Sequence, residues 1–217
     1  MYSSNKSNIP NKYKLKYLNV KNLIEYKNKL MKLYPNCVHD SGLKSDYSGH
    51  KITYGEMDYS GLDKIIEYLP NKTFTSFLDI GSGRGKLCLY MCGFENIAKS
   101  IGVELVHERH ADALELKSKL ASYPNLVSKL ELINANFMKV DLSMLKSTTP
   151  LIWISNLCFD PELTNQIFEK ISSSELTGII ACSKEYTGTS QQFVKLNTIP
   201  IKMSWTESSQ VYLYKLG

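Results

Sequence analysis

The stretch that decides the fold is SFLDIGSGRGKLCLYM, residues 76–91, where an apolar run leads through three glycines into a second apolar run. The pattern predicts a short buried strand over 76–80 and a helix that begins at Lys86 and reaches about residue 93. Glycine tolerates the backbone angles of tight turns, so Gly81, Gly83 and Gly85 predict a turn between the two elements. A glycine turn between a strand and a helix is typical of nucleotide-binding α/β folds.

Three ligands suit such a turn, and the spacing of the residues separates them. A phosphate-binding P-loop is excluded because Ile80 occupies its first glycine position and Leu87 follows the lysine. A dinucleotide fingerprint is disfavoured because Lys86 occupies its third glycine position. Asp79, at the end of the strand, would repel a pyrophosphate but attract the cationic amino-acid end of S-adenosylmethionine. The turn therefore predicts a site for that methyl donor.

The next two predicted strands support the same ligand. The strand over 100–105 ends near Glu104, where a carboxylate is placed to accept hydrogen bonds from both ribose hydroxyls. The strand over 130–135 is followed by Asn136 and Phe137, an amide and an aromatic ring that suit the edge and the face of an adenine.

The remaining pattern alternates between strands and helices. We predict further strands over 150–157 and 177–184, helices over about 60–69, 107–123 and 163–172, and two C-terminal strands as an antiparallel pair at one edge. The alternation indicates an α/β fold, namely a doubly wound, Rossmann-like, seven-stranded and mostly parallel sheet.

Composition excludes several other classes of protein. Hydrophobic residues at 43% and charged residues at 22% are ordinary for a globular chain, so disordered and fibrous classes are excluded. No run approaches the roughly 18 apolar residues that cross a membrane, and no secretory signal is recognisable, so we expect an intracellular protein without membrane contact. The five cysteines form no CxxC pair, so we expect no bound metal and no disulfide framework.

Positive charge is concentrated at the N-terminus. Residues 1–33 hold eight lysines and a single acid, Glu25, so this segment alone exceeds the net charge of +5 of the whole chain. An amphipathic helix is predicted over about 19–34, with an apolar stripe that includes Ile24, Leu30 and Met31, and a loop over 35–53. Two interpretations stay open, a solvated helix face and a contact with DNA or an acidic protein surface. The second would use Lys6, Lys12, Lys14, Lys16, Lys21, Lys27, Lys29 and Lys32.

A family resemblance rests on seven short motifs in order. They are YGE at 54–56, FLDIGSGRGK at 77–86, GVE at 102–104, NANF at 134–137, SNLCFDPEL at 155–163, CSKEY at 182–186 and SWT at 204–206, with Tyr212 beyond them. In kind, order and spacing they resemble the Dot-type (disruptor of telomeric silencing) histone-lysine methyltransferases, which lack a SET domain. The resemblance covers about 54–216 and implies a division into a basic arm with helix and loop, 1–53, and an S-adenosylmethionine-dependent methyltransferase domain, 54–217.

The resemblance also implies roles for individual residues. Tyr54, Gly55 and Glu56 would form a loop over the methionine end of the donor, Glu104 would bind its ribose, and Asn136 and Phe137 its adenine. The residues of the glycine turn implied in donor binding are Asp79, Gly81, Ser82, Gly83 and Gly85.

The acceptor side is implied in the same way. Ser155, Asn156 and Phe159 would line the floor of a lysine channel and Tyr212 its wall, with Ser155, Asn156 and Tyr212 as the catalytic set. Trp205 is expected in the core. The resemblance implies a nucleosome or histone as the protein substrate, and a nuclear, chromatin-associated location in place of a cytoplasmic one.

The chain departs from the family pattern at Ser155, where the family has the first of two asparagines, and at Asn136, where it has an acid. Two alternatives to histone-lysine methylation therefore stay open. One is methylation of a non-histone protein or of nucleic acid, although residues 155–159 lack the double proline of enzymes that methylate base amino groups. The other is a catalytically inactive module that binds the donor or the nucleosome.

Overall fold

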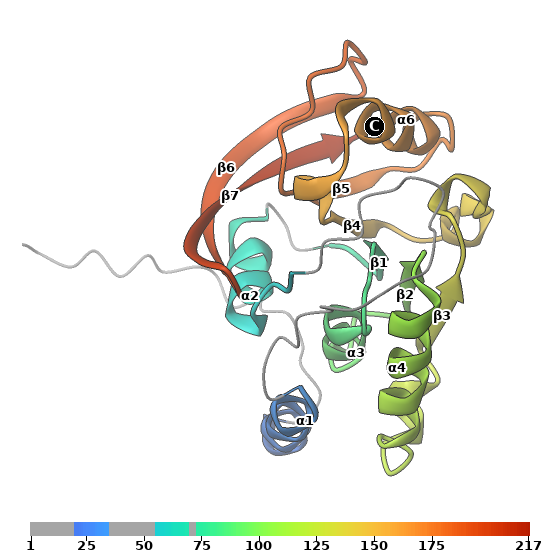
Figure 1. Ribbon diagram of the computed structural model, residues 1–217, viewed down its shortest axis with the longest axis vertical. Helices are drawn as coiled ribbons and strands as arrows, with labels where there is room; N and C mark the ends of the chain where they lie inside the picture. The colour runs from blue at the N-terminus through green and yellow to red at the C-terminus, as the bar shows by residue number, and fades with distance from the viewer. Residues whose placement is uncertain (1–19, 35–54, 70–72) are drawn as a thin grey trace, which may run out of the picture.

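The computed structural model describes residues 20–34, 55–69 and 73–217. Its centre is a seven-stranded sheet with the strand order β3-β2-β1-β4-β5-β7-β6 (Figure 1). The strands are β1 Ser76–Ile80, β2 Lys99–Glu104, β3 Leu130–Asn134, β4 Pro150–Ile154, β5 Gly178–Cys182, β6 Phe193–Met203 and β7 Thr206–Leu216. β1 to β5 are parallel, and β7 pairs antiparallel with both β5 and β6. The predicted doubly wound sheet and its antiparallel C-terminal pair are confirmed.

The helices cover both faces of the sheet. They are α1 Val20–Leu33, α2 Tyr59–Tyr68, α3 Lys86–Met91, α4 His107–Ser118, α5 Pro124–Val127 and α6 Pro161–Ser172, with short 3-10 turns η2 Phe137–Lys139, η3 Leu142–Leu145 and η4 Asn156–Cys158. Figure 1 shows α3 and α4 on one side of the strands and α6 on the other. No helix in the described ranges is long and apolar enough to cross a membrane.

Alternate residues of the central strands face two separate apolar clusters. Phe77 of β1 packs with α1, α2 and α3, whereas Leu78 and Ile80 pack with α6, η2 and η3. A strand buried on both faces needs apolar residues at every position, which explains the unbroken run in β4. Asp79 has the same parity as Phe77 and therefore points toward α3.

The apolar stripe predicted for α1 is wrong in part. Ile24 and Met31 are exposed, whereas Tyr26, Leu30 and Tyr34 form the buried face at a helical spacing of four residues. The Tyr26 hydroxyl donates to the carbonyl of Leu89 at 2.5 Å. That carbonyl lies in the last turn of α3, where a helix leaves carbonyls without an intrahelical partner. A tyrosine here both fills the core with its ring and donates a hydrogen bond to that carbonyl, which an aliphatic residue could not do.

Two predicted boundaries also differ from the structure. The helix predicted over 107–123 ends at Ser118, and Pro124 begins α5 instead of stopping α4. Proline suits the first turn of a helix because the N–H it lacks has no partner there. The strand predicted over 150–157 ends at Ile154, after which the chain turns into η4.

Candidate functional site

The turn after β1 is tied directly to the neighbouring strand β2. Gly81, Gly83 and Gly85 have φ angles of 84°, 54° and 75°, which L side chains rarely adopt. The amides of Gly81 and Ser82 both donate to the carbonyl of Val103, at 2.9 and 3.0 Å. The turn lies at the carboxyl ends of parallel strands, where the strand order reverses between β1 and β4, and this is where open α/β sheets bind ligands.

Glu104, at the end of β2, is buried beneath this turn. Its carboxylate accepts hydrogen bonds from the amides of Gly83, at 2.6 Å, and Val106, at 2.8 Å. Burial raises the pKa of Glu104, although those two amides and the positive charge of Arg109 oppose the rise. An ionised carboxylate has about four acceptor sites, so two remain for a ligand hydroxyl pair.

Asp79 is buried behind the turn with an incomplete set of partners. Its Oδ2 is 3.9 Å from Cys88 Sγ, and its Oδ1 has no hydrogen-bond partner among the described residues. Burial raises the pKa of Asp79 to about 8, and the charge of Glu104 adds to this rise. Buried polar atoms normally have a partner, so the free oxygen fits a cationic group or donor supplied from outside the chain.

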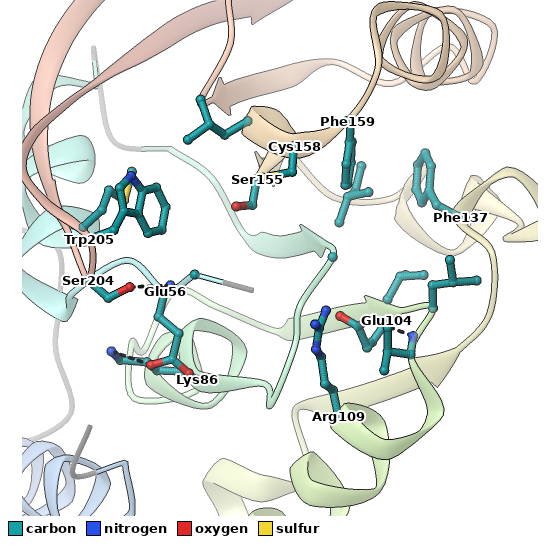
Figure 2. Close-up of a pocket in the computed structure, with 18 of the residues that line it drawn as sticks. Glu56, Lys86, Glu104, Arg109, Phe137, Ser155, Cys158, Phe159, Ser204 and Trp205 are labelled. Atoms are coloured by element: carbon teal, nitrogen blue, oxygen red, sulfur yellow. Dashed lines mark hydrogen bonds and ion pairs between the residues drawn. The ribbon is translucent and has the colours of Figure 1, made fainter. Parts of the chain in front are cut away.

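The segment Gly55–Met57, which we call the donor loop after its predicted role, lines the same cavity as Gly81 of the glycine turn. The Glu56 side chain is buried, and its Oε2 lies 3.3 Å from Lys86 Nζ at the start of α3 (Figure 2). Lys86 Nζ is also 4.0 Å from Asp58 Oδ1 and 5.1 Å from the centre of the Tyr59 ring. The loop therefore presents a carboxylate beside the ammonium that α3 supplies.

A cavity of about 1180 Å³ joins these elements. This volume exceeds that of most small-molecule pockets, so there is room for a ligand and for an entering side chain. Eight of the predicted site residues line it: Gly55, Glu56, Gly81, Glu104, Asn136, Phe137, Ser155 and Phe159. Figure 2 shows Glu104, Arg109 and Phe137 at one end and Glu56, Lys86 and Trp205 at the other.

The remaining predicted residues lie elsewhere. Asp79, Ser82, Gly83, Gly85, Asn156 and Tyr212 are not among the lining residues, and Tyr54 lies outside the described residues. The first four belong to the turn or lie behind it, so they support the wall of the cavity without forming its surface.

The structure separates Ser155 from Asn156. Ser155 lines the cavity, whereas Asn156 is fully buried and its Oδ1 accepts a hydrogen bond from the amide of Lys184 at 2.9 Å. Asn156 thus connects the segments that follow β4 and β5. Tyr212 is on β7, and Lys195 Nζ lies 5.1 Å from the centre of its ring. Neither Asn156, predicted for the floor of the channel, nor Tyr212, predicted for its wall, is among the residues that line the cavity, and their roles stay predictions.

Some lining residues were not predicted from the sequence. Trp205, expected in the core, is 44% exposed and lines the cavity, because it lies at the tip of the β6–β7 hairpin instead of within a strand. Lys86, Arg109, Leu157 and Cys158 also line it. The signal for Lys86 and Arg109 was their position in the first turn of a helix that follows a site strand. The signal for Trp205 was the SWT motif at 204–206, which the family resemblance had already singled out.

At the end of the cavity that Phe137 lines, Asn136 caps η2. Its side-chain oxygen accepts a hydrogen bond from the amide of Met138 at 2.9 Å. The oxygen is thereby oriented toward the backbone, and the amide nitrogen of the side chain is left as a donor. Phe137 is buried beside it and lines the cavity.

Comparisons with known proteins agree on the fold and on a family. The model of the family "Histone methylation protein DOT1" matches residues 34–214. A "Histone-lysine N-methyltransferase, H3 lysine-79 specific" of Caenorhabditis elegans is 25% identical over 176 residues, which cover 72% of this chain and 19% of that protein. The Drosophila melanogaster protein of the same name is 21% identical over 137 residues, covering 61% of this chain and 7% of that protein. The chain thus spans less than a fifth of the length of either relative.

Solved structures are similar in fold at low identity. M. capricolum TrmK in complex with S-adenosyl-homocysteine has a TM-score of 0.54 at 14% identity, over 75% of this chain and 69% of that one. A SAM-dependent methyltransferase from Aquifex aeolicus has a TM-score of 0.53 at 12% identity, over 74% of this chain and 90% of that one. The fold is therefore that of class I methyltransferases, as predicted.

Proposed function

The chain belongs to the family of DOT1 histone methylation proteins, and on that premise we propose that it transfers a methyl group from S-adenosylmethionine to a lysine of a nucleosomal core histone. The observation that supports this most directly is the shared cavity. One end has the glycine turn and Glu104, suited to the donor, and the same lining includes Ser155, Phe159 and Trp205, suited to an entering side chain.

The donor half fits S-adenosylmethionine in chemistry. Glu104 would accept hydrogen bonds from the ribose hydroxyls, and Asn136 and Phe137 would contact the adenine. Glu56 would bind the ammonium of the methionine end, under the loop that includes Tyr54. The turn residues Asp79, Gly81, Ser82, Gly83 and Gly85 would hold the chain close to the ligand, with Gly81 on the surface of the cavity and the others behind it.

The acceptor half must present an uncharged lysine, since an ammonium has no lone pair. The donor, when bound, supplies an electrophilic methyl group on a sulfonium. The amine attacks the methyl carbon, the carbon–sulfur bond breaks with its electron pair left on sulfur, and the nitrogen then releases a proton to solvent. Apolar neighbours such as Phe159 and Leu157 would lower the pKa of the lysine by removing water, and the Ser155 hydroxyl, which lines the same cavity, would orient the amine.

The nucleosome contact would use part of the N-terminal basic segment. Lys27 is engaged with the body of the protein, since its Nζ lies 3.0 Å from Asp63 Oδ2, and Lys29 bonds to Ser122 at 2.9 Å. Lys6, Lys12, Lys14 and Lys16, and the side chain of Lys21, lie outside the described residues. α1 packs into the core. The proposed division between a basic arm, 1–53, and a methyltransferase domain, 54–217, therefore separates two functions and does not mark a break in the packing. The same substrate implies a nuclear, chromatin-associated location.

Substitution of Lys6, Lys12, Lys14 and Lys16 by glutamine tests this contact without removing α1. We expect weaker nucleosome binding and a shallower dependence on salt, because each neutralised phosphate releases a counterion. Measurements at several salt concentrations, with S-adenosylhomocysteine binding as the control for folding, would decide. An unchanged salt dependence would exclude these lysines from the contact.

The experiment that tests the proposed function is transfer of labelled methyl from S-adenosylmethionine to intact nucleosomes, free histones, bare DNA and RNA. We expect label on a histone, and more of it in nucleosomes than in free histones. Label on DNA or RNA alone would favour methylation of nucleic acid. Donor binding without transfer to any acceptor would favour the inactive module. That alternative is suggested by Ser155, which stands where the family has an asparagine.

A further inference from the structure

The tip of the β6–β7 hairpin, Met203–Thr206, is bonded to the donor loop on both sides of Glu56. The amide of Ser204 donates to the carbonyl of Glu56 at 2.8 Å, and the amide of Glu56 donates to Ser204 Oγ at 3.1 Å (Figure 2). Met57 and Met203 form an antiparallel bridge beside them. The backbone of Glu56 is thus held by a segment that lies 148 positions later in the chain.

The Trp205 ring covers Gly55 so closely that only glycine fits. A Cβ atom at Gly55 would lie 2.2 Å from Cζ3 and 2.4 Å from Cε3 of that ring. The obstacle to a side chain at residue 55 is therefore the tryptophan ring.

The same ring also borders the cavity. Trp205 lines it together with Glu56 and Lys86, and Figure 2 shows its ring on the side of the cavity where the Glu56–Lys86 pair lies. A rigid ring laid on a glycine restricts the loop, which would otherwise have the wide conformational freedom of that residue. Without the ring, the loop would sample more conformations before binding. It would therefore lose more conformational entropy when a ligand binds.

We propose that Trp205 is a positioning residue for the donor. By packing on Gly55 it holds the donor loop in the conformation in which Glu56, paired with Lys86, faces the methionine end of S-adenosylmethionine. This inference rests on the proposed function for the identity of the ligand. It does not depend on which acceptor receives the methyl group.

The test is binding of S-adenosylhomocysteine, by calorimetry, to four forms of the full chain: the wild type, Gly55→Ala, Trp205→Ala and the double variant. Each single variant should bind roughly 3- to 10-fold more weakly, because each breaks the same contact. The double variant should be no weaker than the weaker single variant, because the added methyl group then has room. Wild-type binding by either single variant, or a double loss equal to the product of the single losses, would overturn the proposal.

Fluorescence supplies a readout that a purely structural role would not change. The chain has two tryptophans, and Trp153 is buried in β4. We expect S-adenosylhomocysteine to change the emission of the wild type and of Trp153→Phe, and to leave that of Trp205→Phe unchanged. A ligand-induced change that persists in Trp205→Phe contradicts the proposal, since the ring would then not sense the donor.

Failure of this inference differs from failure of the proposed function. A wild-type chain that binds no S-adenosylhomocysteine overturns both. A wild type that binds it, with all three variants binding equally well, overturns the role of Trp205 alone. Trp205→Phe is the conservative variant in the same assay, and we expect it to bind more tightly than Trp205→Ala because a phenyl ring still covers Gly55.

Discussion

Two turns line the cavity, and they are stabilised in different ways. The turn after β1 is held by its own glycines and by the next strand, through the bonds from Gly81 and Ser82 to Val103. The tip of the β6–β7 hairpin is held by the distant donor loop, through Ser204 and Trp205. The conformation of the first turn is therefore fixed locally and can be recognised in a short stretch of sequence, whereas that of the second depends on tertiary contacts.

The difference predicts how each turn responds to substitution. A change in the glycine turn should abolish donor binding directly, since no other segment can replace it. A change at the hairpin tip should act through the donor loop and be graded. The four predictions that follow run from the largest expected effect to the smallest, and the first three concern the turn after β1 and the acids beside it.

Gly83→Arg should remove donor binding, with a loss of about 100-fold or more in affinity. Residue 83 has a φ of 54° and its amide bonds to Glu104, so a side chain there strains the turn and disturbs the bond that fixes Glu104. Calorimetry with S-adenosylhomocysteine measures the effect. Ser147→Arg, an exposed position in the loop before β4, adds the same charge and should leave binding unchanged. Full binding by Gly83→Arg would mean that the donor does not use this turn.

Glu104→Gln should weaken donor binding by roughly 10- to 100-fold, because hydrogen bonds to a charged group contribute about 1.5–3 kcal/mol. The amide keeps the shape of the side chain but cannot accept on both of its ends. Glu131→Gln is the matched control on the adjacent strand β3, where the carboxylate pairs with Lys99 at 2.7 Å on the surface. Equal losses in the two variants would indicate a general effect of charge instead of a bond to the ribose.

Asp79→Asn should stabilise the fold while it weakens donor binding. In the folded chain the pKa of Asp79 is raised to about 8, so between about pH 4 and pH 8 the folded state keeps a proton that the unfolded state has lost. Wild-type stability contributed by this group therefore falls as pH rises through that window. The asparagine variant avoids the cost of burying a charge, and we expect a gain of about 1–3 kcal/mol near pH 8 that fades toward pH 4.

Thermal unfolding of both chains across this pH range measures the gain. Asp141→Asn is the control of opposite sign, because hydrogen bonds from the side chain and backbone of Ser143 lower the pKa of Asp141. A gain for Asp79→Asn that is constant with pH would show that Asp79 is ionised throughout.

Tyr26→Phe removes a contact between segments far apart in the chain, as at the hairpin tip, and should have the smallest effect. It removes the hydroxyl that bonds to Leu89 and leaves a buried carbonyl without that partner, at a cost of about 1 kcal/mol. For a chain of this size that corresponds to roughly 2–4 °C in Tm. Tyr68→Phe, on an exposed tyrosine of α2, should change Tm by less. Equal Tm values for Tyr26→Phe and the wild type would mean that the bond contributes nothing to the docking of α1.

The contrast between the turns also explains which sequence predictions were confirmed. β1 is Ser76–Ile80 as predicted, because its residues are apolar or buried on both faces and a glycine marks its end. The site residues that follow strands, such as Glu104 and Phe137, lie at the cavity for the same reason. The buried face of α1 was predicted incorrectly because Tyr26 was not counted as apolar, although its ring is buried and its hydroxyl has a partner in α3.

On the acceptor side, neighbours in sequence have different surroundings. Ser155 and Asn156 are adjacent, yet one faces the cavity and the other bonds to Lys184. The direction of each side chain depends on the turn into η4 and on how β5 ends beside it, and neither is encoded in the two residues themselves. Trp205 was misplaced for a similar reason, since its exposure depends on where the hairpin tip lies.

By itself, the sequence determined the strand–turn–helix unit, the order of the elements and the acids near the ends of the strands. These features follow from periodicity and from the conformational preferences of glycine, which act over a few residues. Tertiary structure alone decided that Glu56 meets Lys86, that Trp205 covers Gly55 and that Asn156 turns away from the cavity. Those contacts join segments far apart in the chain, and their geometry exists only once the sheet and both of its faces have packed.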